Sequence, residues 1–173
     1  TEIRSYEIAF LEGGSELSAR DCYQGYIWSI PDGRLVRHVK FLQQDPNSSL
    51  LPFCRSKPDS KWEKVFVLNS DGQKTGLYDI EDGTPIYTLD YDARNAVLSP
   101  DEKLVALYTS EKIVFLQYSD GKILKEIAEP GIGWLFFYPD GKTLGVVEGT
   151  LTKFWDVGDF QVIDTVNGTG LGS

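Results

Sequence analysis

The chain consists of short apolar segments that alternate with polar turns along its whole length. The apolar segments are five to eight residues long and rich in β-branched or aromatic residues, and Asp-Gly, Pro-Asp or Gly-Gly pairs bound them. Such segments are typical of β-strands, because Asp-Gly supplies the positive φ that tight hairpin turns require. No apolar stripe with helical spacing extends beyond two turns. The pattern therefore predicts an all-β chain of hairpin-linked strands.

The turns recur at a nearly constant interval. Segments 97–107 and 136–147 each contain an apolar strand, a Pro-Asp turn and a second apolar strand, and Asp101 and Asp140 in these turns are 39 residues apart. A later turn in each repeat carries an aspartate, at positions 32, 82, 120 and 159, with steps of 50, 38 and 39 residues. A four-stranded propeller blade takes up about 40 residues. We interpret the polar residues 56–61 as an insertion between two strands that lengthens the first step.

This spacing predicts four four-stranded antiparallel β-propeller blades within one propeller segment that spans residues 1–173. The blades occupy about residues 5–42, 49–90, 94–128 and 131–167, and residues 168–173 are expected to form a flexible tail. The predicted strands, from inner to outer within each blade, are 6–11, 17–22, 26–30 and 35–41, then 50–54, 64–68, 74–80 and 85–89, then 96–99, 104–109, 112–117 and 123–127, then 132–137, 143–147, 151–157 and 161–166.

At these repeats the chain resembles the WD40 repeat family, in which an apolar strand, Pro-Asp-Gly-Lys and a second apolar strand precede an aromatic strand that ends in Trp-Asp. Residues 139–142 and the triplet Phe154-Trp155-Asp156 carry the resemblance, which extends over about residues 5–167. The other repeats depart from it, with Trp28-Ser29, Tyr78-Asp79 and Leu116-Gln117 in place of Trp-Asp. The family's Gly-His pair is missing, and with one histidine in the chain its buried His-Asp network cannot form.

The resemblance implies a ring of seven or eight blades, whereas the sequence contains four. An open half-ring would expose two apolar blade faces to water, and large apolar patches on a soluble protein usually mark an interface. Three expectations stay open. The chain is half of a longer propeller, it pairs with a copy of itself to make eight blades, or it closes as a four-bladed ring. The absence of methionine favours a trimmed or processed chain.

Charge and composition narrow the classes of partner. The net charge of −9 at pH 7 repels phosphate backbones, so direct binding to nucleic acid is not expected. No apolar run approaches the roughly 20 residues that a membrane-spanning helix needs, so no membrane partner is expected. Cys22 and Cys54 are expected to be buried free thiols. We expect an intracellular protein, in the cytoplasm or the nucleus.

The residues that could carry chemistry favour no enzyme and no cofactor. The single histidine, His38, lies on a predicted outer strand and is more typical of a solvated residue than of a base. No set of His or Cys ligands is available for a metal, and Asp90-Tyr91-Asp92 lacks the glycine and late glutamate of a calcium loop. The turn aspartates at 32, 82, 120, 140 and 159 are interpreted as turn formers, because they recur with the repeat.

One basic cluster stands out against the acidic background. Arg34, Arg37, His38 and Lys40 lie within seven residues of one another. We interpret them as charges on an outer strand that discourage edge-to-edge pairing. The alternative is a basic patch for an acidic partner.

The resemblance implies a protein-interaction scaffold that binds a protein or peptide through its blade loops. In the family, partners commonly dock on the face made by the second-to-third strand turns and the inter-blade loops. On this chain that face would carry Tyr23, Gln24, Gln44, Asp71, Tyr91, Arg94, Glu111, Glu129 and Glu148. Its acidic balance would suit a basic peptide or tail. The alternatives are an ordinary solvated rim, part of a propeller enzyme of the lactonase or quinoprotein type whose active site lies in a missing half, and a self-assembling half-propeller.

Overall fold

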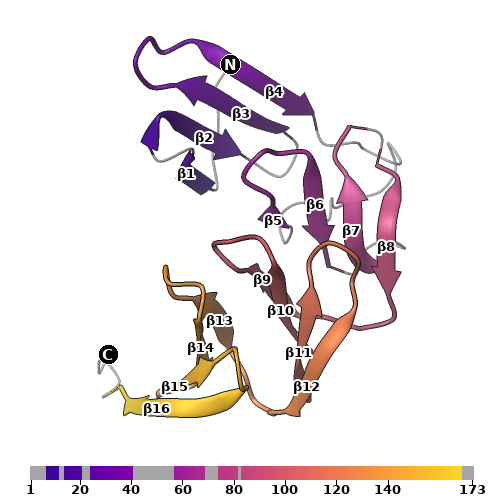
Figure 1. The fold of residues 1–173 in the computed structure, drawn as a ribbon, viewed down its shortest axis with the longest axis vertical. Helices are drawn as coiled ribbons and strands as arrows, with labels where there is room; N and C mark the ends of the chain where they lie inside the picture. The colour runs from indigo at the N-terminus through magenta and orange to yellow at the C-terminus, as the bar shows by residue number, and fades with distance from the viewer. Residues whose placement is uncertain are drawn as a thin grey trace. The chain divides into compact units, whose positions relative to one another are not determined.

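The computed structural model describes residues 7–11, 14–20, 24–40, 57–68, 74–81 and 83–168. These residues form four antiparallel sheets, each with four strands that follow one another in the sequence (Figure 1). The all-β prediction of four four-stranded sheets is thereby confirmed. No helix in the described part of the chain has the length and hydropathy that crossing a membrane would require.

Sheet 1 contains β1 (Glu7–Leu11), β2 (Glu16–Arg20), β3 (Gln24–Ser29) and β4 (Leu35–Lys40). Sheet 2 contains β5 (Lys57–Pro58), β6 (Lys64–Val67), β7 (Thr75–Asp79) and β8 (Pro85–Leu89). Sheet 3 contains β9 (Asn95–Leu98), β10 (Leu104–Tyr108), β11 (Lys112–Gln117) and β12 (Ile123–Ala128). Sheet 4 contains β13 (Trp134–Phe137), β14 (Thr143–Glu148), β15 (Leu151–Asp156) and β16 (Gln161–Asn167).

One backbone hydrogen bond repeats in every sheet. The residue that follows the third strand donates its N–H to a carbonyl in the turn between the first two strands. The four pairs are Ile30 to Ser15 (2.9 Å), Ile80 to Glu63 (2.9 Å), Tyr118 to Lys103 (2.8 Å) and Val157 to Lys142 (2.9 Å). Backbone N–H groups that leave a strand need an acceptor, and the first turn supplies it. The bond therefore joins the end of the third strand to the first turn in the same way in each sheet. It also defines which residues are equivalent from sheet to sheet.

The first turn of sheets 2, 3 and 4 has one geometry despite three different sequences. The residue with positive φ is Trp62, Glu102 or Gly141, at 55°, 55° and 66°. In each turn one side-chain oxygen accepts two backbone N–H groups. This oxygen is Asp59 Oδ1 in sheet 2, Ser99 Oγ in sheet 3 and Asp140 Oδ1 in sheet 4. Short polar side chains of this kind stabilise turns by replacing a backbone acceptor.

The turn aspartates act as the repeat predicted. Asp32, Asp120 and Asp159 each accept the N–H of the residue two positions later, at 3.2, 3.0 and 3.1 Å. A hydrogen bond from the Lys142 backbone lowers the pKa of the Asp140 carboxyl. Hydrogen bonds from the Ser29 side chain and the Arg34 backbone lower the pKa of the Asp32 carboxyl. Asp82 lies outside the described residues. These carboxylates therefore serve the turns.

The interpretation of residues 56–61 as a polar insertion is wrong. Lys57 and Pro58 form β5, and Asp59–Glu63 form the first turn of sheet 2, equivalent to the Pro-Asp turns of sheets 3 and 4. The extra residues of the first step lie between β4 and β5, that is between Lys40 and Lys57. The strand predicted at 50–54 lies outside the described residues, as do Cys22, Cys54 and residues 169–173.

The chain divides into two compact units, residues 1–88 with sheets 1 and 2 and residues 89–173 with sheets 3 and 4. In the first unit, Ile27 and Val39 of sheet 1 are buried together with Trp62, Val65 and Tyr78 of sheet 2. The Trp62 ring lies directly on the backbone of Gly25, where a side chain would overlap it. This contact accounts for a tryptophan at positive φ, because the packing of its ring offsets the backbone strain.

The second unit has a core of the same kind. Ala106, Ile113 and Phe115 of sheet 3 pack against a second set from sheet 4, and each of these three is completely buried. The sheet 4 set consists of Leu135, Leu144, Val146 and Trp155. Both cores therefore lie between consecutive sheets, as expected for sheets whose two faces are apolar.

We predict that Gly25→Ala destabilises the first unit. The added methyl group would overlap the buried Trp62 ring, so the ring must leave its place and the core must repack. We expect the free energy of unfolding to fall by about 1–3 kcal/mol, as measured by urea denaturation followed by tryptophan fluorescence. Gly133→Ala is the control, because the nearest atom to its new methyl would be Val147 O at 3.6 Å. Equal losses in both variants would contradict the role given to the Trp62 contact.

Candidate functional site

Four connections in the second unit lie at the same end of sheets 3 and 4. They are the segment 90–94 before β9, the turn 109–111 after β10, the segment 129–133 after β12 and the turn 149–150 after β14. Backbone hydrogen bonds join them to one another and to the strand ends: Arg94 N–H donates to Tyr108 O at 2.8 Å, Glu129 N–H to Glu111 O at 3.0 Å and Gly133 N–H to Val147 O at 2.8 Å. We call these four connections the loop face.

Five of the nine predicted site residues lie on the loop face or at its margin. They are Tyr91, Arg94, Glu111, Glu129 and Glu148. Arg94 and Glu111 are exposed, whereas Tyr91, Glu129 and Glu148 are half-buried. Gln24 belongs to the first unit, at the start of β3, where its Oε1 lies 3.2 Å from His38 Nε2. Tyr23, Gln44 and Asp71 lie outside the described residues. A role of any of these residues in binding stays a prediction.

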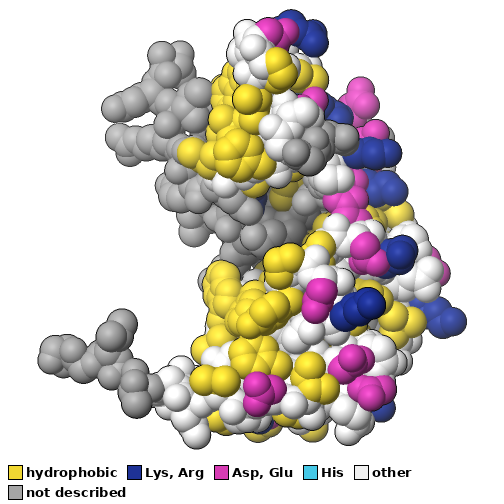
Figure 2. Space-filling model, turned by 60° about the vertical axis from the view of Figure 1, so that its left-hand side comes forward, with side chains coloured by type: hydrophobic (Ala, Val, Ile, Leu, Met, Phe, Trp, Pro, Cys, Tyr) yellow, Lys and Arg dark blue, Asp and Glu magenta, His cyan; other side chains and the backbone are white. Residues whose placement is uncertain are grey.

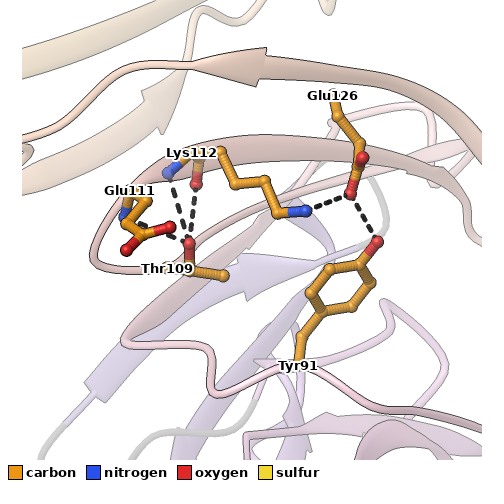
Figure 3. Close-up of polar contacts among 5 residues, drawn as sticks. All are labelled: Tyr91, Thr109, Glu111, Lys112 and Glu126. Atoms are coloured by element: carbon orange, nitrogen blue, oxygen red, sulfur yellow. Dashed lines mark hydrogen bonds and ion pairs between the residues drawn. The ribbon is translucent and has the colours of Figure 1, made fainter.

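The first cluster on the loop face is built around Glu126 of β12 (Figure 3). The Tyr91 hydroxyl and the Lys112 ammonium both donate to Glu126 Oε1, each at 2.6 Å. Lys112 Nζ also lies 5.1 Å from the centre of the Tyr91 ring, within cation–π range. Thr109 Oγ1 accepts the N–H groups of Glu111 and Lys112, which fixes the adjoining turn. The cluster therefore ties the inter-sheet segment to the outer two strands of sheet 3.

The electrostatics of this cluster follow from its hydrogen bonds. Burial first, and then the bond to Glu126, raise the pKa of the Tyr91 phenol to about 12. The bond from Lys112, followed by that from Tyr91, lowers the pKa of the Glu126 carboxyl. Glu126 is therefore ionised and Tyr91 is protonated at neutral pH.

The second cluster is built around Lys153 of β15. Its ammonium donates to Glu129 Oε1 at 2.5 Å and to Glu148 Oε1 at 3.1 Å. All three side chains are largely covered, with 22%, 14% and 18% of their surface exposed for Lys153, Glu129 and Glu148. The hydrogen bond to Glu129 is the main cause of the raised pKa of Lys153. Two of the predicted site glutamates are thus joined to each other through one cation.

The residues at the centre of these clusters, Lys112, Glu126 and Lys153, were missed by sequence reasoning. Strand register explains the first pair: Lys112 lies opposite Ala128 and Glu126 opposite Val114, so the two charges are diagonal neighbours on one face of sheet 3. Assigning a strand register to the predicted hairpin of segments 112–117 and 123–127 could have shown that Lys112 and Glu126 are neighbours. The contact of Lys153 with Glu129 joins a strand to an inter-sheet segment, and no sequence signal indicates it.

Three residues of the basic cluster, Arg34, Arg37 and His38, make contacts within the first unit. The strand lies at the outer edge of sheet 1, as predicted. The Arg34 side chain pairs with Asp32 at 3.7 Å, and Arg37 Nη1 donates to the Lys61 carbonyl at 2.7 Å. His38 stacks on the Tyr26 ring at 4.4 Å, with the two planes 3° apart. The position of the strand agrees with the interpretation as an outer strand, and the role of its charges stays a prediction.

The described residues offer no arranged metal-binding group. Among them, no set of three or more His, Cys, Asp or Glu side chains is placed to hold a metal ion. A shallow depression of about 300 Å³ in the first unit is lined by Arg37, His38, Val39, Ile80 and Glu81. It shares no residue with the loop face.

Comparison with solved structures decides the fold. The chain is similar to hydrazine synthase of Kuenenia stuttgartiensis, with a TM-score of 0.59 and 17% identity over 94% of this chain and 49% of that one. It is also similar to the Cps50 (Swd1) β-propeller domain of Myceliophteria thermophila, with a TM-score of 0.58 and 12% identity over 94% of this chain and 55% of that one. The fold is that of a β-propeller. Each four-stranded sheet is one propeller blade.

The comparisons do not extend to a function. The β-propeller chain spans about half the length of these two solved chains, and identities of 17% and 12% show the fold alone. No protein-family model and no curated protein matches the sequence.

We predict that Tyr91 ionises with a pKa of about 12 and that Glu126→Gln lowers this value. Burial would remain in the variant, so its pKa should stay above the ordinary value of 10.0. Because the folded protein holds the phenolic proton more tightly than the unfolded chain, this contribution to stability is present below pH 10 and is lost between pH 10 and about 12. Ultraviolet difference titration against Tyr91→Phe isolates this tyrosine. Glu129→Gln, which leaves the cluster intact, should not change its pKa.

We predict that Lys153→Met lowers the free energy of unfolding by about 1–3 kcal/mol at pH 7. The variant would leave the carboxylates of Glu129 and Glu148 half-buried near each other without their shared cation. The loss should shrink as salt is added, because ions screen the repulsion between the two carboxylates. Denaturant titration at low and high salt measures it. The exposed Lys122→Met serves as control, and a loss that does not vary with salt would contradict the ion-pair explanation.

Proposed function

We propose that the chain is a protein-interaction scaffold of the WD40-like propeller type and that the loop face binds a basic peptide or tail. The charge around the loop face carries this proposal. Six carboxylates and three cationic side chains lie on it or in its two clusters, which gives a local net charge of −3. The carboxylates are those of Asp90, Asp92, Glu111, Glu126, Glu129 and Glu148, and the cations are Arg94, Lys112 and Lys153.

The exposed part of this charge is the part a partner would meet. Lys112 and Lys153 are held by glutamates, so their charge is largely neutralised. Asp90, Asp92 and Glu111 are exposed, and the exposed cation Arg94 is the only opposite charge among the residues 90–94 and 109–111. An acidic surface of this kind attracts a basic partner and speeds its approach. The net charge of −9 for the whole chain acts in the same direction.

The two clusters also prepare the loop face for binding. A surface loop that must be ordered on binding loses conformational entropy, which weakens the affinity. Here Tyr91, Glu129 and Glu148 are already held by the clusters, so the segments that bear the exposed charges are fixed to the strands beforehand. Tyr91 and Arg94 are of the residue types that dominate the energetics of interfaces.

We predict that a fluorescein-labelled peptide of alternating Lys and Ala binds the chain and that Asp92→Asn with Glu111→Gln weakens the binding. Each exposed charge pair contributes about 0.2–1 kcal/mol, so the loss of two pairs should raise the Kd by about two- to thirtyfold. The wild-type affinity should fall with added salt. Fluorescence anisotropy measures both effects, and a peptide in which Glu replaces Lys should not bind.

The control must carry the same change in net charge at another place. Glu63→Gln with Asp164→Asn removes two exposed carboxylates from the first turn of sheet 2 and from β16. This control should bind the Lys peptide within about twofold of the wild type. An equal loss of affinity in both double variants would show that net charge alone, and not the loop face, determines binding. Absence of binding to the Lys peptide would refute the proposal.

A further inference from the structure

Each sheet presents two apolar faces, which its strand register separates. The front face carries Leu17, Ala19 and Trp28 in sheet 1, Val65, Val67 and Tyr78 in sheet 2, and Leu144, Val146 and Trp155 in sheet 4. The repeated hydrogen bond from the third strand to the first turn makes these positions equivalent. The back face carries the residues between them, since neighbours along a strand point to opposite sides. These include Gly25 and Ile27 in sheet 1, Ala106 and Phe115 in sheet 3, and Gly145 and Phe154 in sheet 4.

Both cores join a front face to a back face. In the first unit, Val65, Val67 and Tyr78 on the front of sheet 2 pack with Ile27 on the back of sheet 1. In the second unit, Leu144, Val146 and Trp155 on the front of sheet 4 pack with Ala106 and Phe115 on the back of sheet 3. The two units therefore contain the same kind of sheet-to-sheet interface.

On the front face of sheet 1, the apolar side chains of β1 are not covered by any other part of the chain that the structure describes. Ile8 pairs with Ala19 as Leu135 pairs with Val146, yet Ile8 is 64% exposed and Leu135 is completely buried. Phe10 beside it is 72% exposed. On the same face the Tyr26 ring stacks on Trp28, with ring centres 5.5 Å apart. Ala19 on this face is 7% exposed, whereas Ile8 and Phe10 are of core residue types without the burial of a core.

On the back face of sheet 4, apolar side chains are likewise left exposed by the described residues. Trp134 is 57% exposed, and Phe136 lies across the backbone of Gly145. Tyr138 extends this aromatic cluster, with ring centres 5.8 Å from Phe136 and 5.6 Å from Phe154. Figure 2 shows hydrophobic side chains gathered at the surface in the upper part of the view and again in the lower part. Exposed apolar patches of this kind on a soluble protein mark an interface.

We propose that these two faces bind each other between two copies of the chain. The back of sheet 4 in one copy covers the front of sheet 1 in the second, and the second copy does the same to the first. One uncovered front and one uncovered back are the two halves of the interface that already occurs in each unit. The chain matches 55% of the length of a solved β-propeller domain, so two copies together have about the length of one such domain. A head-to-tail contact that closes after two copies is also self-limiting.

The solution mass of the chain tests this proposal, by size exclusion with light scattering at micromolar concentration. We expect a mass near twice 19.4 kDa. Phe10→Glu, on the front of sheet 1, and Trp134→Glu, on the back of sheet 4, should each halve this mass. Both side chains are more than half exposed, so neither change should unfold the protein, and circular dichroism checks that it does not. Ile86→Glu and Ile123→Glu, at exposed positions on the outer strands β8 and β12, should remain dimeric.

Mixing the two monomeric variants tests the front-to-back pairing itself. The Phe10→Glu copy keeps its back face and the Trp134→Glu copy keeps its front face, so one of the two interfaces can form in the mixture. We expect a mixed dimer to appear that neither variant forms alone. A wild-type monomer, open-ended polymers, or a dimer that persists when either face is changed would each overturn the proposal. A dimer lost in one variant alone would point to identical faces in contact and would overturn it too.

Discussion

Sheet-to-sheet packing is the interaction on which the rest of this structure depends. A four-stranded sheet with two apolar faces is not stable alone in water, because strands need a covered face to offset the entropy of ordering them. Each unit meets this requirement by packing the front face of its second sheet on the back face of its first sheet. The front-face residues are Val65 and Tyr78 in the first unit and Leu144 and Trp155 in the second. Trp62 shows how strongly packing acts, since it holds a positive φ that a tryptophan rarely adopts while its ring covers Gly25.

The polar ends of the sheets are organised by a different interaction. Glu126 and Lys153 each join two partners, and in both clusters one partner comes from an inter-sheet segment. Hydrogen-bonded ion pairs that are partly covered are stronger than exposed ones, because water screens them less. The loop face therefore combines fixed segments with the exposed charges of Asp92, Arg94 and Glu111.

The fold leaves the function open for a physical reason. A propeller blade is defined by its apolar faces and turns. Hydrazine synthase and Swd1 share this fold with the chain although only 17% and 12% of the aligned residues are identical to it. What distinguishes propellers is the chemistry of the connections, which packing does not constrain. In this chain the loop face and the two exposed apolar faces of sheets 1 and 4 are the features that could distinguish it.

The sequence by itself determined the local structure of this protein. Alternating apolar residues and the recurring turn aspartates predicted all of the described strands except β5, because strand period and turn chemistry are local properties. The error at β5 has a local cause too: Lys57 and Pro58 make a two-residue strand that carries no apolar pattern, and the turn after it uses Trp62 at the position of a glycine. The grouping of Tyr91, Arg94, Glu111, Glu129 and Glu148 at one end of two sheets also followed from strand order.

Only the tertiary structure decided which of these residues act together. Two contacts depend on how an inter-sheet segment lies against a neighbouring strand. Lys153 pairs with Glu129, 24 residues away, and Tyr91 pairs with Glu126, 35 residues away. The sequence likewise indicates that Ile8 and Leu135 are both apolar strand residues, but not that one is exposed and the other buried. Burial depends on the neighbour that covers a face, and a neighbour is a property of the fold rather than of the strand.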